Sequence, residues 1–182
     1  APVVAAERAF AADGLALGVR DAFLKHSAPD AIVFQPDVQK VHETFPKQDP
    51  DKGGPPLVWW PLWAGIARSG DLGFTTGPYS YDGQLRGYYF TVWKKQADGG
   101  WKWVYDGGPP SDASSAAPQG SQPAYLPVST TKGKHPESAL ADVRKAEAAL
   151  DAAARVEVAA AYKAVLISGA RVAGSRAAPG ET

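Results

Sequence analysis

The sequence predicts an α+β domain in which N-terminal helices pack on a strongly curved antiparallel sheet. Three observations lead to this prediction. Apolar residues recur at helical spacing in the first 26 positions, four segments rich in β-branched and aromatic residues follow between positions 58 and 106, and turn-forming residues separate these segments. The chain has 182 residues, enough for one ordinary domain and an additional segment.

Two consecutive helices are predicted over residues 3–26. The apolar side of the first helix consists of Val3, Ala6, Phe10 and Leu17. Gly18 is expected to end this helix, because glycine readily adopts the left-handed conformation found at helix ends. A shorter helix then begins at Val19, and Pro29 is expected to stop it.

A first strand is predicted over 30–35, followed by a long irregular connection over 36–57 that is rich in proline and charge. The remaining strands are expected at 58–67, 72–81, 87–95 and 101–106. Ser69-Gly70-Asp71, Asp82-Gly83 and Asp98-Gly99-Gly100 supply the tight turns between them. Consecutive strands joined by short turns predict an antiparallel meander.

The chain is expected to divide into three parts. Residues 1–108 form the α+β domain, residues 109–137 a Pro/Ser/Gly-rich linker, and residues 138–182 a helical segment. The helix within this last segment is expected to end near Gly169. An offset of 139 aligns Val19 with Val158 and Phe23 with Tyr162. The helical segment is therefore either the start of a second, incomplete copy of the domain or a helix that docks on the first domain or on a partner chain.

Composition excludes several classes of function. Lysine plus arginine and aspartate plus glutamate both number 19, and no basic stripe is present, so nucleic acid is not an expected partner. The absence of cysteine removes disulfides, thiol nucleophiles and cysteine-based zinc sites. The three histidines lack metal-ligand spacing, and we expect neither a metal nor a cofactor. No apolar run approaches the roughly 20 residues of a membrane-spanning helix.

The N-terminal residues allow two interpretations of localisation. The small, apolar stretch Ala1-Pro2-Val3-Val4 resembles a mature end left by signal-peptide cleavage, which would make the protein exported and periplasmic. The alternative is an arbitrary boundary, and the sequence does not decide between them.

Aromatic residues are concentrated in the predicted sheet, where all six tryptophans lie between positions 59 and 103. Such side chains form the core, a dimer interface or the walls of a ligand pocket. We predict a pocket for a small apolar or aromatic molecule between the sheet and the helices. Its predicted walls are Trp60, Trp63, Tyr79, Tyr89, Trp93 and Trp103, and its polar anchor is Asp106.

Two other functions compete with this prediction. One is an enzyme of isomerase, hydrolase or cyclase type that uses Asp37, His42 or Asp106 as acid or base. The other is an oligomerisation module whose aromatic face meets a second chain. Glu7, next to Arg8 on the first helix, is expected on a solvated face.

Several segments within about residues 3–108 follow the pattern of a known family. The most specific are Trp60-Pro61 and Ser69–Tyr79, which reads Ser-Gly-Asp-Leu-Gly-Phe-Thr-Thr-Gly-Pro-Tyr, and the pattern continues in Gly87–Lys95. The resemblance is to the SnoaL-like proteins of the nuclear-transport-factor-2-like superfamily. It implies a cystatin-like cone, a curved sheet around a cavity, and a homodimer formed through the sheet.

The same superfamily contains ketosteroid isomerase, and the resemblance allows that activity to be examined. The isomerase has a catalytic aspartate just after its first strand, where this chain has Gln35 before Pro36. The helix tyrosine that stabilises its oxyanion would fall near Ala11, which has no hydroxyl. Since two essential roles are empty, we do not expect steroid isomerase chemistry.

Overall fold

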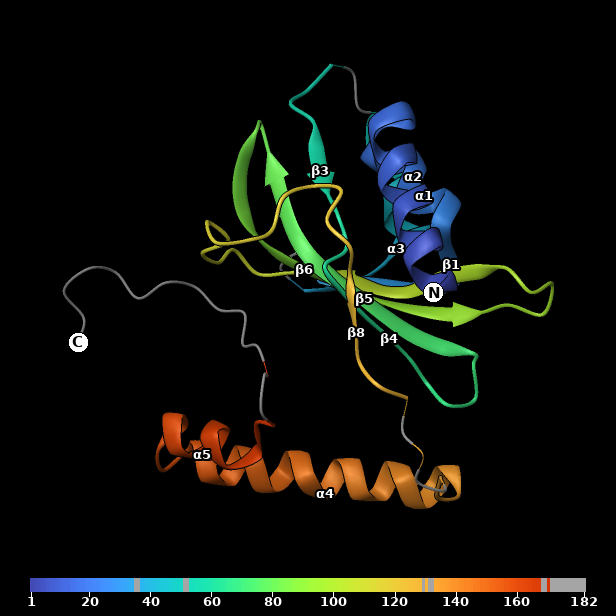
Figure 1. Cartoon of the computed structure of the whole chain (residues 1–182). Helices are drawn as coiled ribbons and strands as arrows, with labels where there is room; N and C mark the ends of the chain where they lie inside the picture. Colours follow the sequence, from blue (N-terminus) through green and yellow to red (C-terminus); the bar gives the residue numbers. More distant parts are fainter. Residues whose placement is uncertain (35–36, 51–52, 129, 131–132, 168–169, 171–182) are drawn as a thin grey trace. The chain divides into compact units, whose positions relative to one another are not determined.

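The computed structural model describes residues 1–34, 37–50, 53–128, 130, 133–167 and 170 (Figure 1). The chain forms two compact units. The first contains Ala1–Ser129 and the second Thr130–Val172. The first unit has an α+β fold in which N-terminal helices cover a curved, open, mixed sheet, in agreement with the fold class predicted from the sequence.

The predicted pair of N-terminal helices is confirmed. α1 spans Pro2–Leu17 and α2 spans Val19–His26. Gly18 separates them with a φ of 85°, a backbone conformation that residues other than glycine rarely adopt. The second helix ends at His26, three residues before the proline that was expected to stop it.

The segment after α2 contains short elements. β1 spans Ser27–Phe34, β2 Val38–Lys40, α3 Val41–Thr44 and the 3₁₀ helix η1 Phe45–Lys47. β1 starts three residues earlier than predicted and includes Pro29. The pairing of β1 with the strand at Trp101–Gly107 is irregular between Ser27 and Ile32. Pro29 lies in this interval and has no N–H to donate to a neighbouring strand.

The antiparallel meander is confirmed. Its strands are β3 (Leu57–Trp59), β4 (Trp63–Ile66), β5 (Leu72–Tyr81), β6 (Gln84–Lys95) and β7 (Trp101–Gly107). The strand predicted over 58–67 is divided in two by Trp60-Pro61-Leu62. The sheet order is β2-β1-β7-β6-β5-β4-β8, where β8 is the short strand Ala124–Tyr125, and β3 also pairs with β5. Because β1 joins β7 in parallel, the sheet is mixed rather than purely antiparallel.

The turn between β5 and β6 follows the sequence prediction closely. Asp82 and Gly83 both have positive φ, 54° and 70°. Two residues of this kind form the type I′ turn whose twist matches a two-stranded hairpin. The Asp-Gly pair therefore fixes the register of the two longest strands, β5 and β6.

A β-bulge in β7 changes which face its side chains occupy. Trp103 pairs with Trp93, but the next pair is Tyr105 with Val92, so Val104 is the extra residue. In a regular strand, simple alternation would place Trp103 and Tyr105 on one face. The bulge turns Tyr105 to the outer face, where its ring contacts Phe34, and it turns Asp106 to the inner face, opposite Thr91.

The core of the first unit lies between α1 and the inner face of the sheet. Phe10 is at its centre, with ring centroids 4.9 Å from Trp59, 5.9 Å from Trp103 and 4.9 Å from Phe23. Trp93 and Trp103 are completely buried. Aromatic side chains thus fill the space immediately beneath α1.

The segment after β7 stays against the sheet for part of its length. Pro110 bridges to Gly87, and β8 (Ala124–Tyr125) pairs in parallel with β4. The proposed division at 108 and 137 stays a prediction, but residues up to Leu126 contribute contacts to the first unit.

The second unit is a helical hairpin of α4 (Pro136–Ala154) and α5 (Val158–Val165). Glu157 caps α5 by accepting hydrogen bonds from the backbone N–H groups of Ala159 and Ala160. Gly169, the expected end of the helical segment, lies outside the described residues. No helix in the described part of the chain is long and apolar enough to cross a membrane.

Candidate functional site

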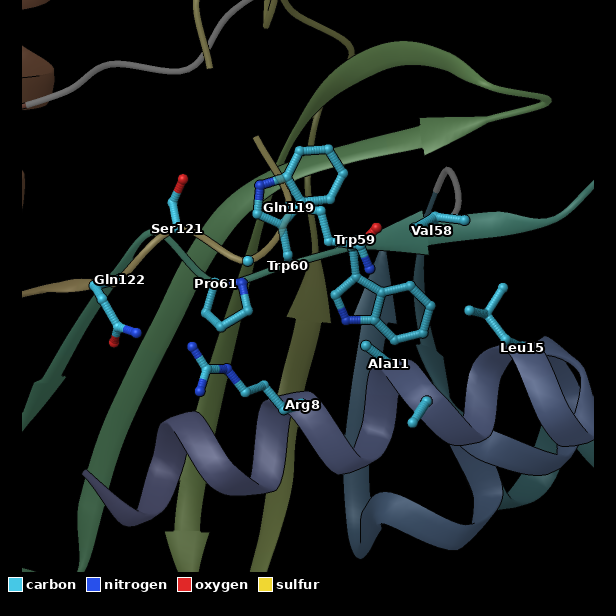
Figure 2. A pocket seen from close by; sticks show the side chains of 12 residues that line it. Arg8, Ala11, Leu15, Val58, Trp59, Trp60, Pro61, Gln119, Ser121 and Gln122 are labelled. Atoms are coloured by element: carbon cyan, nitrogen blue, oxygen red, sulfur yellow. The ribbon is translucent and has the colours of Figure 1, made fainter. Parts of the chain in front are cut away.

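A groove of about 460 Å³ lies along one side of α1 in the first unit (Figure 2). Three segments that are distant in sequence form it: α1, the β3–β4 connection, and the loop before β8. The lining consists of Arg8, Ala11, Ala12, Leu15, Val58, Trp59, Trp60, Pro61, Gln119, Gly120, Ser121 and Gln122. Most of this surface is apolar.

The helical wall follows from residue spacing. Arg8, Ala11, Ala12 and Leu15 are separated by three, one and three positions, so they share one face of α1. Two alanines on this face leave room for a ligand, and Leu15 adds an apolar side chain at the end. The core-facing side of α1 carries the buried residues Val3, Glu7, Phe10 and Gly14. One helix therefore supplies both the core and the groove wall.

The floor of the groove is the connection between β3 and β4. Trp60-Pro61-Leu62 stays close to β5 through hydrogen bonds from the Leu62 N–H to the Thr76 carbonyl (2.9 Å) and from the Trp60 N–H to the Pro78 carbonyl (3.4 Å). A Cβ at Gly77 would lie 1.9 Å from the Trp60 carbonyl oxygen. Glycine is therefore required at this position for the floor to approach the sheet.

The third wall is the loop that contains Gln119–Gln122, which sequence analysis placed in a linker. The indole N–H of Trp60 donates to the Ala117 carbonyl at 2.9 Å. After the loop, the Ala124 N–H donates to the Leu62 carbonyl at 2.9 Å. Trp60 thus lines the groove and also holds the loop that closes it.

A buried polar cluster lies behind Trp59. Glu7 has no exposed surface, and it accepts a hydrogen bond of 2.6 Å from the Trp59 indole N–H and one of 3.2 Å from that of Trp93. The Thr75 hydroxyl also donates to it. Burial raises the pKa of Glu7, and these hydrogen bonds oppose the rise. The prediction that Glu7 occupies a solvated face was wrong, although its spacing from Val3 and Phe10 indicates the core side.

Asp106 lies on the same inner face of the sheet. It accepts a hydrogen bond of 2.6 Å from the Thr91 hydroxyl, and desolvation raises its pKa to about 7. The Tyr89 hydroxyl and the Trp103 indole N–H are buried without hydrogen-bond partners. Burial also raises the pKa of Tyr89 well above its ordinary value.

The structure separates the predicted pocket residues into three groups. Tyr89, Trp93, Trp103 and Asp106 point to the inner face together, and Tyr79 packs against the same core. Trp63 is on the outer face, with its ring 6.1 Å from that of Tyr88. Trp60 lines the groove.

None of the three predicted acid–base candidates, Asp37, His42 and Asp106, lies in the groove lining. Asp37 and His42 are exposed, and the Nε2 atom of His42 lies 2.9 Å from the Ser27 hydroxyl oxygen. Gln35, at the position compared with the isomerase base, lies outside the described residues. Within the described residues, no three side chains of the metal-binding types lie close enough together to hold a metal ion.

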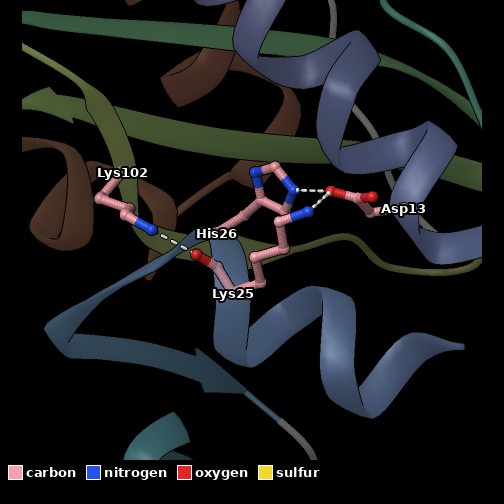
Figure 3. A network of polar contacts seen from close by, with 4 residues as sticks. All are labelled: Asp13, Lys25, His26 and Lys102. Carbon is pink, nitrogen blue, oxygen red and sulfur yellow. Dashed lines mark hydrogen bonds and ion pairs between the residues drawn. The ribbon is translucent and has the colours of Figure 1, made fainter. Parts of the chain in front are cut away.

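Another polar network connects α1, α2 and β7 (Figure 3). Asp13 lies 2.6 Å from Nε2 of His26 and 2.8 Å from Nζ of Lys25, and Lys102 donates to the Lys25 carbonyl. Hydrogen bonds from Lys25 and His26 lower the pKa of Asp13, while burial lowers that of His26. The network holds the helix pair together, and none of its four residues lines the groove.

No protein-family model matches the chain, and no curated protein matches it. A crystal structure titled “putative ketosteroid isomerase”, from Shewanella frigidimarina, is similar to it with 17% identity and a TM-score of 0.38. The alignment covers 56% of this chain and 89% of that one.

The sequence predictions missed several residues that form the groove. Arg8 was noted only as the neighbour of Glu7, Trp59 was not among the predicted walls, and Gln119–Gln122 were assigned to a linker. The helical spacing of residues 8, 11, 12 and 15 was an available signal for the α1 wall. Nothing local in the sequence indicates that the 119–122 loop returns to it.

Proposed function

We propose that this chain is a small-molecule-binding domain and that its binding site is the groove between α1, Trp59-Trp60-Pro61 and the 119–122 loop. The ligand is a small molecule with an apolar or aromatic body. Of the predicted pocket residues, Trp60 belongs to this site. The other six stay predictions, with Tyr89 and Asp106 as polar groups deeper in the same unit.

The groove itself is the observation that supports this proposal. Its volume of about 460 Å³ is within the range of roughly 300–1,000 Å³ typical of small-molecule sites. The indole rings of Trp59 and Trp60 supply flat apolar surface at low conformational cost. Both are restrained, Trp59 by Glu7 and Trp60 by the Ala117 carbonyl, so the site is formed before a ligand arrives.

Binding of a neutral aromatic probe tests the proposal. We expect 2-naphthalenemethanol to change tryptophan fluorescence saturably. Ala12→Phe, which places a ring in the groove, should weaken this binding at least about tenfold, a loss of roughly 1.4 kcal/mol. Ala9→Phe is the matched control, because Ala9 is also exposed on α1 but outside the groove lining. Equal affinity of the two variants would contradict the proposal.

A second proposed property is homodimer formation through the outer face of the sheet. Phe74 and Phe90 stack there with ring centroids 5.2 Å apart. Together with Leu126 they line a shallow apolar depression of about 360 Å³. Exposed apolar surface of this kind favours association. Sedimentation analysis should give a dimer for the wild type and a monomer for Phe90→Lys. A wild-type monomer at high protein concentration would contradict it.

A further inference from the structure

The groove is chemically different at its two ends. Figure 2 shows the guanidinium group of Arg8 near Pro61, on the side where Ser121 and Gln122 lie. Ala11, Leu15, Val58 and the Trp59 ring lie toward the other end. The first end offers hydrogen-bond donors and a positive charge, whereas the second offers only apolar contact. A ligand that fits both ends has one polar head and one apolar body.

Arg8 determines the sign of the head group. It is the only charged residue in the groove lining, which contains no carboxylate. Among the described residues, no acidic group forms an ion pair with it. Its neighbour Glu7 points to the core, where the Trp59 and Trp93 indoles and Thr75 surround it. The guanidinium is therefore available to an anion that enters the groove.

The number of charges and the geometry favour a carboxylate. A single guanidinium balances one negative charge, and its planar fork can donate two parallel hydrogen bonds to the two oxygens of a carboxylate. The side-chain amide of Gln122 and the hydroxyl of Ser121 can donate to the same oxygens. Arg8 is exposed, so added salt should screen its attraction for the carboxylate.

We infer that the groove binds a monocarboxylate with a flat apolar body, with Arg8 on the carboxylate and Trp59, Trp60 and Leu15 around the body. This inference rests on the proposed function and specifies the ligand class for the same groove. Arg8 is the residue that distinguishes a carboxylate ligand from a neutral one of equal shape.

Two probes with the same ring system test this inference. 2-Naphthoate carries the carboxylate, and 2-naphthalenemethanol is its neutral counterpart. For the wild type we expect naphthoate to bind about five- to tenfold more tightly than the alcohol, with an advantage that decreases as salt is added. Arg8→Gln should remove this advantage by weakening naphthoate more than the alcohol. Arg8→Lys should retain part of it, because it keeps the charge and loses the fork.

The control and the outcomes separate this inference from the proposed function. Lys47→Gln removes one positive charge from an exposed site outside the groove lining, and it should leave both affinities unchanged. If both probes bind with equal affinity, or if Arg8→Gln weakens them equally, the carboxylate inference is wrong while the binding groove stands. If neither probe binds, or if Ala12→Phe affects neither, the groove proposal itself is wrong.

Discussion

The carboxyl group of Asp106, on the inner face of the sheet, has a raised pKa. Asp106 would point away from Trp103 in a regular strand, but the bulge at Val104 brings both to the interior. There the charged form of the Asp106 carboxyl loses hydration, and one hydrogen bond from Thr91 compensates only in part. A single inserted residue thereby moves this aspartate from the outer face of the sheet to the inner face, where it is partly buried.

The pH dependence of stability should report this burial. The pKa of Asp106 is raised from 3.8 to about 7, so the folded state holds the proton more tightly than the unfolded state. Its stabilising contribution is complete below about pH 4 and is lost as the pH rises through 7. At about 1.4 kcal/mol for each unit of pKa difference, the loss is at most roughly 4 kcal/mol.

Asp106→Asn isolates this effect, because asparagine keeps the shape and stays neutral. In urea unfolding, we expect the variant and the wild type to have similar free energies of unfolding at pH 4. At pH 8 the variant should be the more stable. Equal differences at the two pH values would show that Asp106 is not desolvated as described.

Glu7 should be important for stability because it satisfies three buried donors. Glu7→Ala leaves the Trp59 indole N–H and the Thr75 hydroxyl without this acceptor, and each such loss costs roughly 1–3 kcal/mol. The Trp93 indole N–H keeps a second acceptor, the Thr75 hydroxyl oxygen at 2.8 Å. We expect a decrease in the free energy of unfolding of at least about 2 kcal/mol, measured by urea denaturation. Glu7→Gln keeps the volume and should cost less.

The matched control is Glu43→Ala. Glu43 is exposed and pairs with Lys40 at 2.9 Å, so its removal should change stability by no more than about 0.5 kcal/mol. A Glu7→Ala variant as stable as this control would disprove the structural role of the buried carboxyl.

At the scale of elements, the close approach of the β3–β4 connection to β5 determines the groove floor. A Cβ at Gly77 would lie 1.9 Å from the Trp60 carbonyl oxygen. The backbone fixes the positions of both atoms, so a side-chain rotation cannot relieve this clash. Gly77→Ala should therefore displace Trp60. We expect a loss of about 2 kcal/mol or more in thermal or urea unfolding and weaker binding of the naphthyl probes.

Gly54→Ala provides the comparison. Gly54 has no atom within 4 Å of a Cβ position, so the substitution should be close to neutral. If Gly77→Ala is equally neutral and binds the probes normally, the floor does not approach β5 as described.

The elements themselves could largely be predicted, because their signals are local. Gly18 between two apolar patterns gave the α1–α2 break, and Asp82-Gly83 gave the hairpin turn. The bulge at Val104 and the break at Trp60-Pro61-Leu62 could not, since both depend on how one strand meets its neighbours. For the same reason the sequence alone does not predict which face of the sheet the side chain of Asp106 occupies.

For the whole molecule, the two compact units differ in the burial of their apolar residues. The first has an aromatic core, whereas Leu140 and Val143 of α4 are about half exposed, at 51% and 53%. α2 and α5 have bounds that differ by 139 at both ends, the offset of the proposed repeat. The repeat and the domain boundaries stay predictions.

Truncation tests the independence of the first unit. A chain that ends at Val128 keeps all the groove residues and β8, so it should unfold cooperatively with a free energy within about 1 kcal/mol of the full chain. Circular dichroism during urea denaturation measures this. An aggregated or non-cooperative product would show that the first unit requires the second.

The central claim is that the groove beside α1 binds a small molecule, and indole N–H signals in a ¹H–¹⁵N NMR titration with 2-naphthalenemethanol test it most directly. The six tryptophans report from different places. We predict saturable shifts for Trp59 and Trp60 and none for Trp63, which lies on the outer face of the sheet. Shifts confined to Trp63, or no saturable shift at any tryptophan, would contradict the account.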